Sequence, residues 1–108
     1  MAEKFPERIK ALPVQKGRLD TSDKYKLEAK NCNVLFASYQ PGTSIPLHAH
    51  DDADVFGVVT RGEIILTVDG KTTRHGVGEW YHIPPGAGHA TVFEQETDEI
   101  EFWFKPNT

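Results

Sequence analysis

The sequence predicts an all-β domain, folded as a small antiparallel sandwich or barrel. Short runs of apolar and β-favouring residues recur along the chain, separated by turn signals about every 8–12 residues. No segment shows a long helical period, and the chain has no internal repeat. This combination is typical of sandwiches and barrels built from about seven or eight short strands.

The first expected strand covers residues 32–39 (CNVLFASY) and ends at the turn Gln40-Pro41-Gly42. The next strand, SIPLHAH, contains Pro46, which cannot donate to a ladder and therefore favours an edge position. Asp69-Gly70 is a strong two-residue hairpin signal. Further strands are expected at VFGVVT, EIILTV, KTTR, EWYHI, HATVF and EIEFWF.

Length and pattern together predict one folded unit. A chain of 108 residues suffices for a single domain with a modest core. Residues 1–31 are polar and have no firm period, so we expect an N-terminal arm packed on the barrel or on a dimer partner. Residues 32–108 are expected to form the barrel domain.

Composition and charge argue against nucleic-acid-binding, membrane-spanning and secreted proteins. The net charge is −4, without the clustered basic face expected of a nucleic-acid-binding protein. No apolar run approaches the ~18 residues that a membrane span requires. The chain has a single cysteine, Cys32, and its first residues lack the apolar run of a secretory signal. We therefore expect a cytoplasmic protein that binds neither nucleic acid nor membrane.

Three histidines are the candidate metal ligands. His48 and His50 are two residues apart in an expected strand, so their side chains point to the same face, opposite Ile45 and Leu47. His89 opens another strand and shares a face with Phe93. If these histidines face the inside of a small barrel, they can meet and bind one divalent transition metal per chain, with Fe, Mn, Ni, Zn and Cu as alternatives.

The spacing of these residues resembles that of the cupin superfamily, in particular its small single-domain bacterial members. Gly42–x5–His48–x–His50, followed by Gly62, resembles the first cupin motif. Gly78–x5–Pro84–x–Gly86–x2–His89 resembles the second. The resemblance covers roughly residues 33–104. It implies a jelly-roll β-barrel with one metal ion in its lumen and a homodimer, which the apolar residues on both strand faces also favour.

The chain departs from the family pattern at the remaining ligand, which is usually a glutamate. Counting back from Gly62 puts Val55 at that position, whereas counting forward from His50 allows Asp54 if a bulge turns it inward. Two sites therefore remain open: three histidines with Asp54, or three histidines alone. A site without the carboxylate is more positive by one unit and has an open position for an anionic substrate or O2.

Four residues are candidates for the wall of the pocket: Phe93, Trp80, Val55 and His82. Phe93 shares the face of His89. His82 precedes the Pro-Pro-Gly turn and is either a contact near the barrel mouth or, more simply, a hydrogen-bonded histidine. The remaining aromatic residues are expected in the core and a dimer interface.

The resemblance implies a metal-dependent enzyme, dioxygenase-like or an isomerase or lyase, acting on a small organic acid or carbonyl compound. No side chain in the sequence identifies itself as the catalytic acid or base. One alternative is a non-catalytic module that binds a small ligand or a metal as a sensor or store. Another is a structural or partner-binding domain, which would not depend on His48 or His89.

Overall fold

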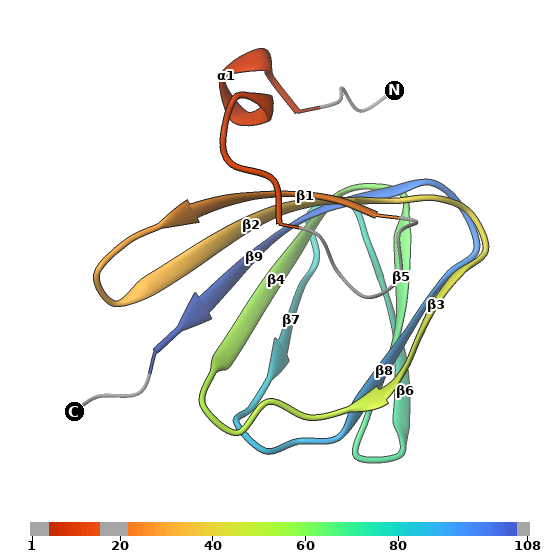
Figure 1. Ribbon diagram of the computed structural model, residues 1–108. Helices are drawn as coiled ribbons and strands as arrows, with labels where there is room; N and C mark the ends of the chain where they lie inside the picture. The colour runs from red at the N-terminus through yellow and green to blue at the C-terminus, as the bar shows by residue number, and fades with distance from the viewer. Residues whose placement is uncertain (1–4, 16–21, 106–108) are drawn as a thin grey trace.

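The computed structural model describes residues 5–15 and 22–105, which form one short helix and nine strands (Figure 1). The helix α1 spans Glu7–Lys10. The strands are β1 (Ser22–Glu28), β2 (Cys32–Tyr39), β3 (Thr43–His48), β4 (Asp54–Arg61), β5 (Glu63–Val68), β6 (Lys71–Gly76), β7 (Trp80–Ile83), β8 (His89–Phe93) and β9 (Thr97–Phe104).

The strands form two antiparallel sheets that face each other. One sheet has the order β1-β2-β9-β4-β7 and the other the order β3-β8-β5-β6. Neighbours such as β2 and β9, or β3 and β8, are far apart in the sequence, so the chain crosses repeatedly between the sheets (Figure 1). This arrangement confirms the expected jelly-roll β-barrel.

Strand β1 extends the five-stranded sheet within the segment that the sequence suggested as an arm. It pairs with β2 along its whole length, from Ser22↔Tyr39 to Glu28↔Asn33. The helix lies above these two strands, and the ring of Phe5 meets that of Phe36 edge-on, with 5.7 Å between the ring centroids. Lysines alternate with Tyr25 and Leu27 in β1, so the sequence of this strand reads as a polar segment.

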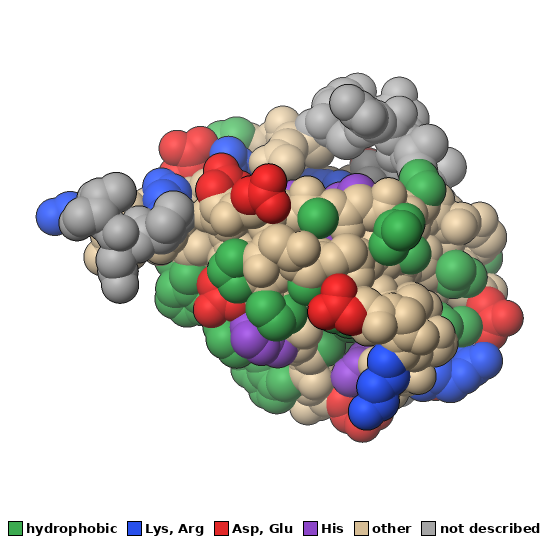
Figure 2. Space-filling model, turned by 90° about the horizontal axis from the view of Figure 1, so that it is seen from below, with side chains coloured by type: hydrophobic (Ala, Val, Ile, Leu, Met, Phe, Trp, Pro, Cys, Tyr) green, Lys and Arg blue, Asp and Glu red, His purple; other side chains and the backbone are tan. Residues whose placement is uncertain are grey.

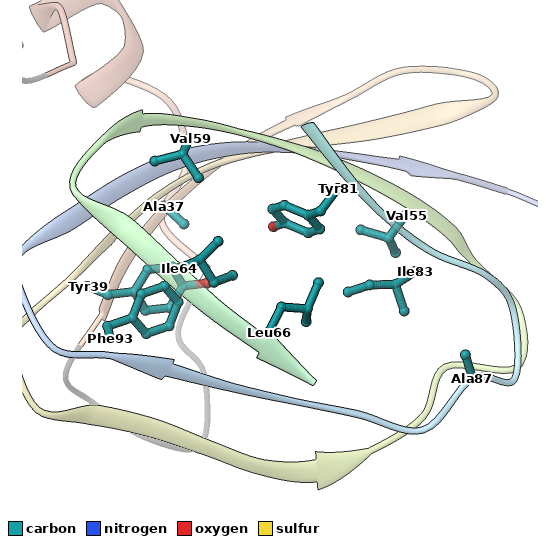
Figure 3. Packing of buried hydrophobic residues seen from close by; sticks show 10 residues of the cluster. All are labelled: Ala37, Tyr39, Val55, Val59, Ile64, Leu66, Tyr81, Ile83, Ala87 and Phe93. Atoms are coloured by element: carbon teal, nitrogen blue, oxygen red, sulfur yellow. The ribbon is translucent and has the colours of Figure 1, made fainter. Parts of the chain in front are cut away.

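The core fills the space between the sheets. Because side chains alternate between the two faces of a strand, each sheet turns one set of residues inward. Figure 3 shows Val55, Tyr81 and Ile83 pointing from the five-stranded sheet toward Ile64 and Leu66 on β5. The predicted hairpin at Asp69-Gly70 is confirmed: Val68 pairs with Lys71, and both turn residues have positive φ.

Charged and apolar side chains are mixed on the surface. On the face seen from below, acidic, basic and apolar side chains are interspersed, and the described lysines and arginines form no continuous stripe there (Figure 2). In the described part of the chain, no helix is long and apolar enough to cross a membrane.

Candidate metal centre

The structure brings His48, His50 and His89 together inside the barrel. Their ligand atoms all lie within 4.8 Å of one another. His48 ends β3 and pairs with His89 at the start of β8, with 4.2 Å between their ring centroids. His50 lies just beyond the end of β3, with its ring 4.8 Å from that of His48 and 5.1 Å from that of His89.

A register shift in β3 turns the first histidine inward. The pairing of β3 with β8 is irregular between Ile45 and His48. Both of these side chains therefore face the lumen, whereas Leu47 is 72% exposed. The expectation that Ile45 lies opposite His48 is wrong, because strict alternation cannot anticipate an irregularity of this kind. Bulges of this type are common beside functional sites.

Backbone carbonyls orient two of the three imidazoles. His48 Nδ1 lies 2.8 Å from the carbonyl oxygen of Pro46, and His89 Nδ1 lies 3.1 Å from that of Ala87. A carbonyl can only accept a hydrogen bond, so each Nδ1 carries the proton and donates it. The lone pair of each ring is then on Nε2, the atom left free to bind a metal.

The electrostatic setting favours the neutral form of His50 and His89. Burial lowers the pKa of His50, and the neighbouring His48 and His89 lower it further. Burial also lowers the pKa of His89, against the opposing effect of its hydrogen bond to Ala87. Neutral imidazole is the form that coordinates a metal. Three convergent imidazole nitrogens fit a divalent transition metal such as Zn or Fe.

Asp54 does not join this group. As neighbours in an extended strand, Asp54 and Val55 point to opposite faces, and Val55, which is 1% exposed, lines the lumen. The Asp54 carboxylate lies outside the lumen, with its Oδ1 2.5 Å from His82 Nε2. Of the two arrangements that the sequence left open, the structure assembles the one with three histidines alone.

The histidines line a cavity of about 190 Å³ between the sheets. Two of the four expected wall residues, Phe93 and Val55, line it, and Phe93 stacks on Tyr39 with 4.0 Å between the ring centroids. Trp80 and His82 do not line it. They lie on the opposite face of β7 from the buried Tyr81, with Trp80 58% exposed and His82 stacked on Phe56.

A wider hollow of about 760 Å³ adjoins the cavity and shares Leu35 and Trp103 with it. Lys26, Lys30 and Lys105 line this outer hollow, with Asp52 as the acidic residue among its described lining. Lysine side chains at the mouth of a cleft attract anions. The outer hollow is therefore a favourable surface for anions.

The lumen also contains a group that the sequence did not single out, here called the carboxyl cluster: Glu99, Glu101 and Tyr81. Glu99 is 1% exposed, and the Tyr81 hydroxyl hydrogen-bonds to it and lies 2.8 Å from Glu101 Oε2. The clean alternation of EIEFWF already places Glu99, Glu101 and Trp103 on one face. Polar residues are usually on the solvent side, so the pattern does not identify that face as the inner one.

Gly57 makes room for the cluster. A Cβ atom at this position would lie 2.1 Å from Tyr81 Cζ, far inside normal contact. The Tyr81 ring therefore passes directly over the backbone of β4 and reaches the carboxyl groups on β9. Burial, followed by the nearby Glu101, raises the pKa of Glu99 well above its ordinary value.

The family model described as "Cupin domain" matches residues 35–103, well over half of the chain. The chain belongs to the cupin family. The matched residues run from β2 to β9 and include the three histidines and the carboxyl cluster.

Other relatives of this cupin agree on the fold. KdgF from Halomonas sp. superimposes with a TM-score of 0.80 at 15% identity, over 97% of this chain and 96% of that one. A mutant salicylate 1,2-dioxygenase from Pseudoaminobacter salicylatoxidans, in complex with gentisate, superimposes with a TM-score of 0.73 at 14% identity, over 81% of this chain and 26% of that one.

A curated relative covers a shorter stretch. The HTH-type transcriptional regulator PuuR of Escherichia coli (strain K12) is 33% identical over 57 residues, which are 53% of this chain. The match spans 31% of the regulator's length, so the similarity concerns part of that protein.

Proposed function

We propose that this cupin is a mononuclear metal-dependent enzyme that acts on a small organic acid or carbonyl compound. His48, His50 and His89 hold the metal. The observation that carries the proposal is their convergence within 4.8 Å. The carbonyl hydrogen bonds at the Nδ1 atoms of His48 and His89 support it, because they leave Nε2 free in both rings.

A bound divalent metal supplies a Lewis acid that polarises a carboxylate or carbonyl oxygen. The side chains around the metal determine which ligands can bind there. Three neutral imidazoles leave the positive charge of the ion uncompensated, which favours an anionic ligand, and the lysines of the outer hollow draw such ligands in. Val55 and Phe93 give the cavity an apolar wall, and its volume of about 190 Å³ limits the ligand to a small molecule.

The reaction falls into one of two classes. An oxygenase-type reaction is favoured by the similarity to a salicylate 1,2-dioxygenase. An isomerase or lyase reaction needs a proton acceptor in the lumen, which Glu101 supplies. Both classes use the three histidines in the same way, so the metal site is tested first.

The test is metal binding by purified variants. We expect the wild-type protein to bind one Zn2+ or Fe2+ per chain, and His48→Ala or His89→Ala to lose at least about 10-fold in affinity. Asp54→Asn is the matched control, since it alters a carboxylate outside the lumen and should bind as the wild type does. Unchanged binding in both alanine variants would overturn the proposal. A large loss in Asp54→Asn would restore the four-ligand alternative.

A second candidate function is ligand sensing without catalysis. It is supported by the 57-residue similarity to a transcriptional regulator. A sensor of this kind binds its small ligand without turning it over. Binding of a small acid that persists in the presence of a chelator and in His48→Ala, with no turnover in any variant, would favour it over the enzyme.

A further inference from the structure

The carboxyl cluster is joined to the histidine site through a single side chain. The indole ring of Trp103 packs edge-on against His50, with 4.6 Å between the ring centroids. Its Nε1–H donates to Glu101 Oε1 at 3.3 Å. Both groups line the same cavity, so a ligand bound at the histidines lies beside the carboxyl groups.

The contacts within the cluster require a stored proton. The Tyr81 hydroxyl lies within hydrogen-bond distance of both Glu99 and Glu101. A phenol has one hydrogen to donate, so its second contact is a hydrogen bond only if that carboxyl group is protonated and donates to the phenol oxygen. Two carboxylates this close do not ionise together. Burial, followed by the nearby Glu101, raises the pKa of Glu99, so we assign the proton to Glu99, which is 1% exposed.

The groups that face the cluster from neighbouring strands reinforce this assignment. Tyr39 on β2 is buried, and both glutamates add to the effect of burial in raising its pKa, so it stays neutral. Lys24 on β1 acts in the opposite direction on Glu99 but more weakly than burial and Glu101. His89 on β8 is neutral and is influenced by the charge of Glu101. Position 57 on β4 is a glycine and adds no charge.

An independent observation shows that this part of the lumen is built for a ligand. Thr91 on β8 lies between His89 and Phe93, is 7% exposed and lines the same cavity. Its hydroxyl oxygen Oγ1 is buried and has no hydrogen-bond partner among the described residues. Leaving a buried polar atom unpaired is energetically unfavourable. A ligand oxygen in the cavity would satisfy it.

We propose that the carboxyl cluster is the acid–base site of this cupin, with Glu101 exchanging a proton with a small hydroxy or oxo acid held at the three histidines. This inference rests on the proposed function. In the forward step, a C–H or O–H bond of the ligand breaks and its electron pair stays on the ligand. The proton passes to the Glu101 carboxylate. The reverse step returns it, so no oxidant or other co-reactant is needed.

The stored proton has a direct spectroscopic test that requires no substrate. At pH 7 the infrared spectrum of the wild-type protein should contain the C=O stretch of a protonated carboxylic acid. Glu99→Gln should abolish this band, and Asp54→Asn should retain it. In Glu101→Gln the band should disappear at lower pH than in the wild type, because the neighbouring negative charge is gone. A spectrum in which Glu99→Gln leaves the band unchanged overturns the proposal.

The exchange step is tested on the Zn2+-loaded full chain with pyruvate as the probe. Transfer of deuterium from D2O into the methyl group of pyruvate, followed by NMR, should be faster than the protein-free rate. Glu101→Gln should lose about 100-fold or more of that acceleration, with saturation by pyruvate unchanged. No acceleration by the wild type, or equal acceleration by Glu101→Gln, overturns the proposal.

Failure of the acid–base proposal and failure of the proposed function give different experimental results. If the acid–base proposal alone is wrong, Zn2+ binding is still intact and still sensitive to His48→Ala. Failure of the proposed function instead appears as Zn2+ binding that is insensitive to His48→Ala, whatever the infrared spectrum shows.

Discussion

Replacing Gly57 by alanine tests the packing on which the lumen depends. The added Cβ atom would lie 2.1 Å from Tyr81 Cζ and 2.3 Å from its hydroxyl oxygen. Carbon atoms pack comfortably at about 3.5–4.0 Å, so the ring must move by more than about 1 Å. Tyr81 is 4% exposed and packed within the core, which leaves it little room to do so.

The expected loss combines three contributions. Overpacking a core costs about 1–3 kcal/mol. Displacing the Tyr81 hydroxyl from its carboxyl partners adds about 1–2 kcal/mol for groups left unpaired in the lumen. Replacing glycine by alanine offsets about 0.4–1 kcal/mol by restricting the unfolded chain. We therefore expect the free energy of unfolding to fall by about 1–5 kcal/mol in Gly57→Ala.

Urea unfolding of four variants measures this effect. Gly88→Ala is the control, because its Cβ would meet only Leu47 Cδ1 at 3.5 Å, an ordinary contact, and should change stability by at most about 0.5 kcal/mol. Gly57→Ala should also cost far less in a Tyr81→Leu background, which lacks the atoms that clash. An equal loss in both backgrounds, or no loss in Gly57→Ala alone, would refute the steric reasoning.

Three further predictions concern charge and surface. Because burial raises the pKa of Glu99 in the folded state, the free energy of unfolding should fall as pH rises above about 4.3, the ordinary glutamate value, and Glu99→Gln should remove that fall. Arg61 holds the buried Asp98 at 3.0 Å, so Arg61→Met should destabilise the protein by about 3–5 kcal/mol in the same urea assay. Trp80 and Phe104 are exposed outside the barrel, so Trp80→Ser should weaken the expected homodimer in analytical ultracentrifugation and leave monomer stability nearly unchanged. A protein that is monomeric at all concentrations would refute the last prediction.

Several features could be predicted because they depend on local spacing. The side-chain period of a strand and the distance between turn signals are enough to predict an all-β fold. The spacing of His48, His50 and His89 was enough to nominate them as candidate metal ligands, and the structure brings them together. The Asp69-Gly70 hairpin follows from two residues that tolerate positive φ.

Other features depend on which strands become neighbours. The irregularity between Ile45 and His48 arises in the pairing of β3 with β8, so no pattern within β3 reveals it. The lysines of β1 make its sequence look polar, and the strand is recognised only from its backbone pairing with β2. The choice between Asp54 and Val55 was likewise decided by the register of β4 in its sheet, which turned Val55 to the lumen.

The sequence by itself determined the fold class and the set of histidines, because both follow from the spacing of residues along the chain. Only the tertiary structure decided which side chains lie beside those histidines. The alternation of the last strand makes Glu99 and Glu101 share a face, but their contact with the Tyr81 hydroxyl depends on the space left by Gly57, and Tyr81 and Gly57 come from two other strands. Burial is a property of the assembled sheets, and it is the main cause of the raised pKa of Glu99.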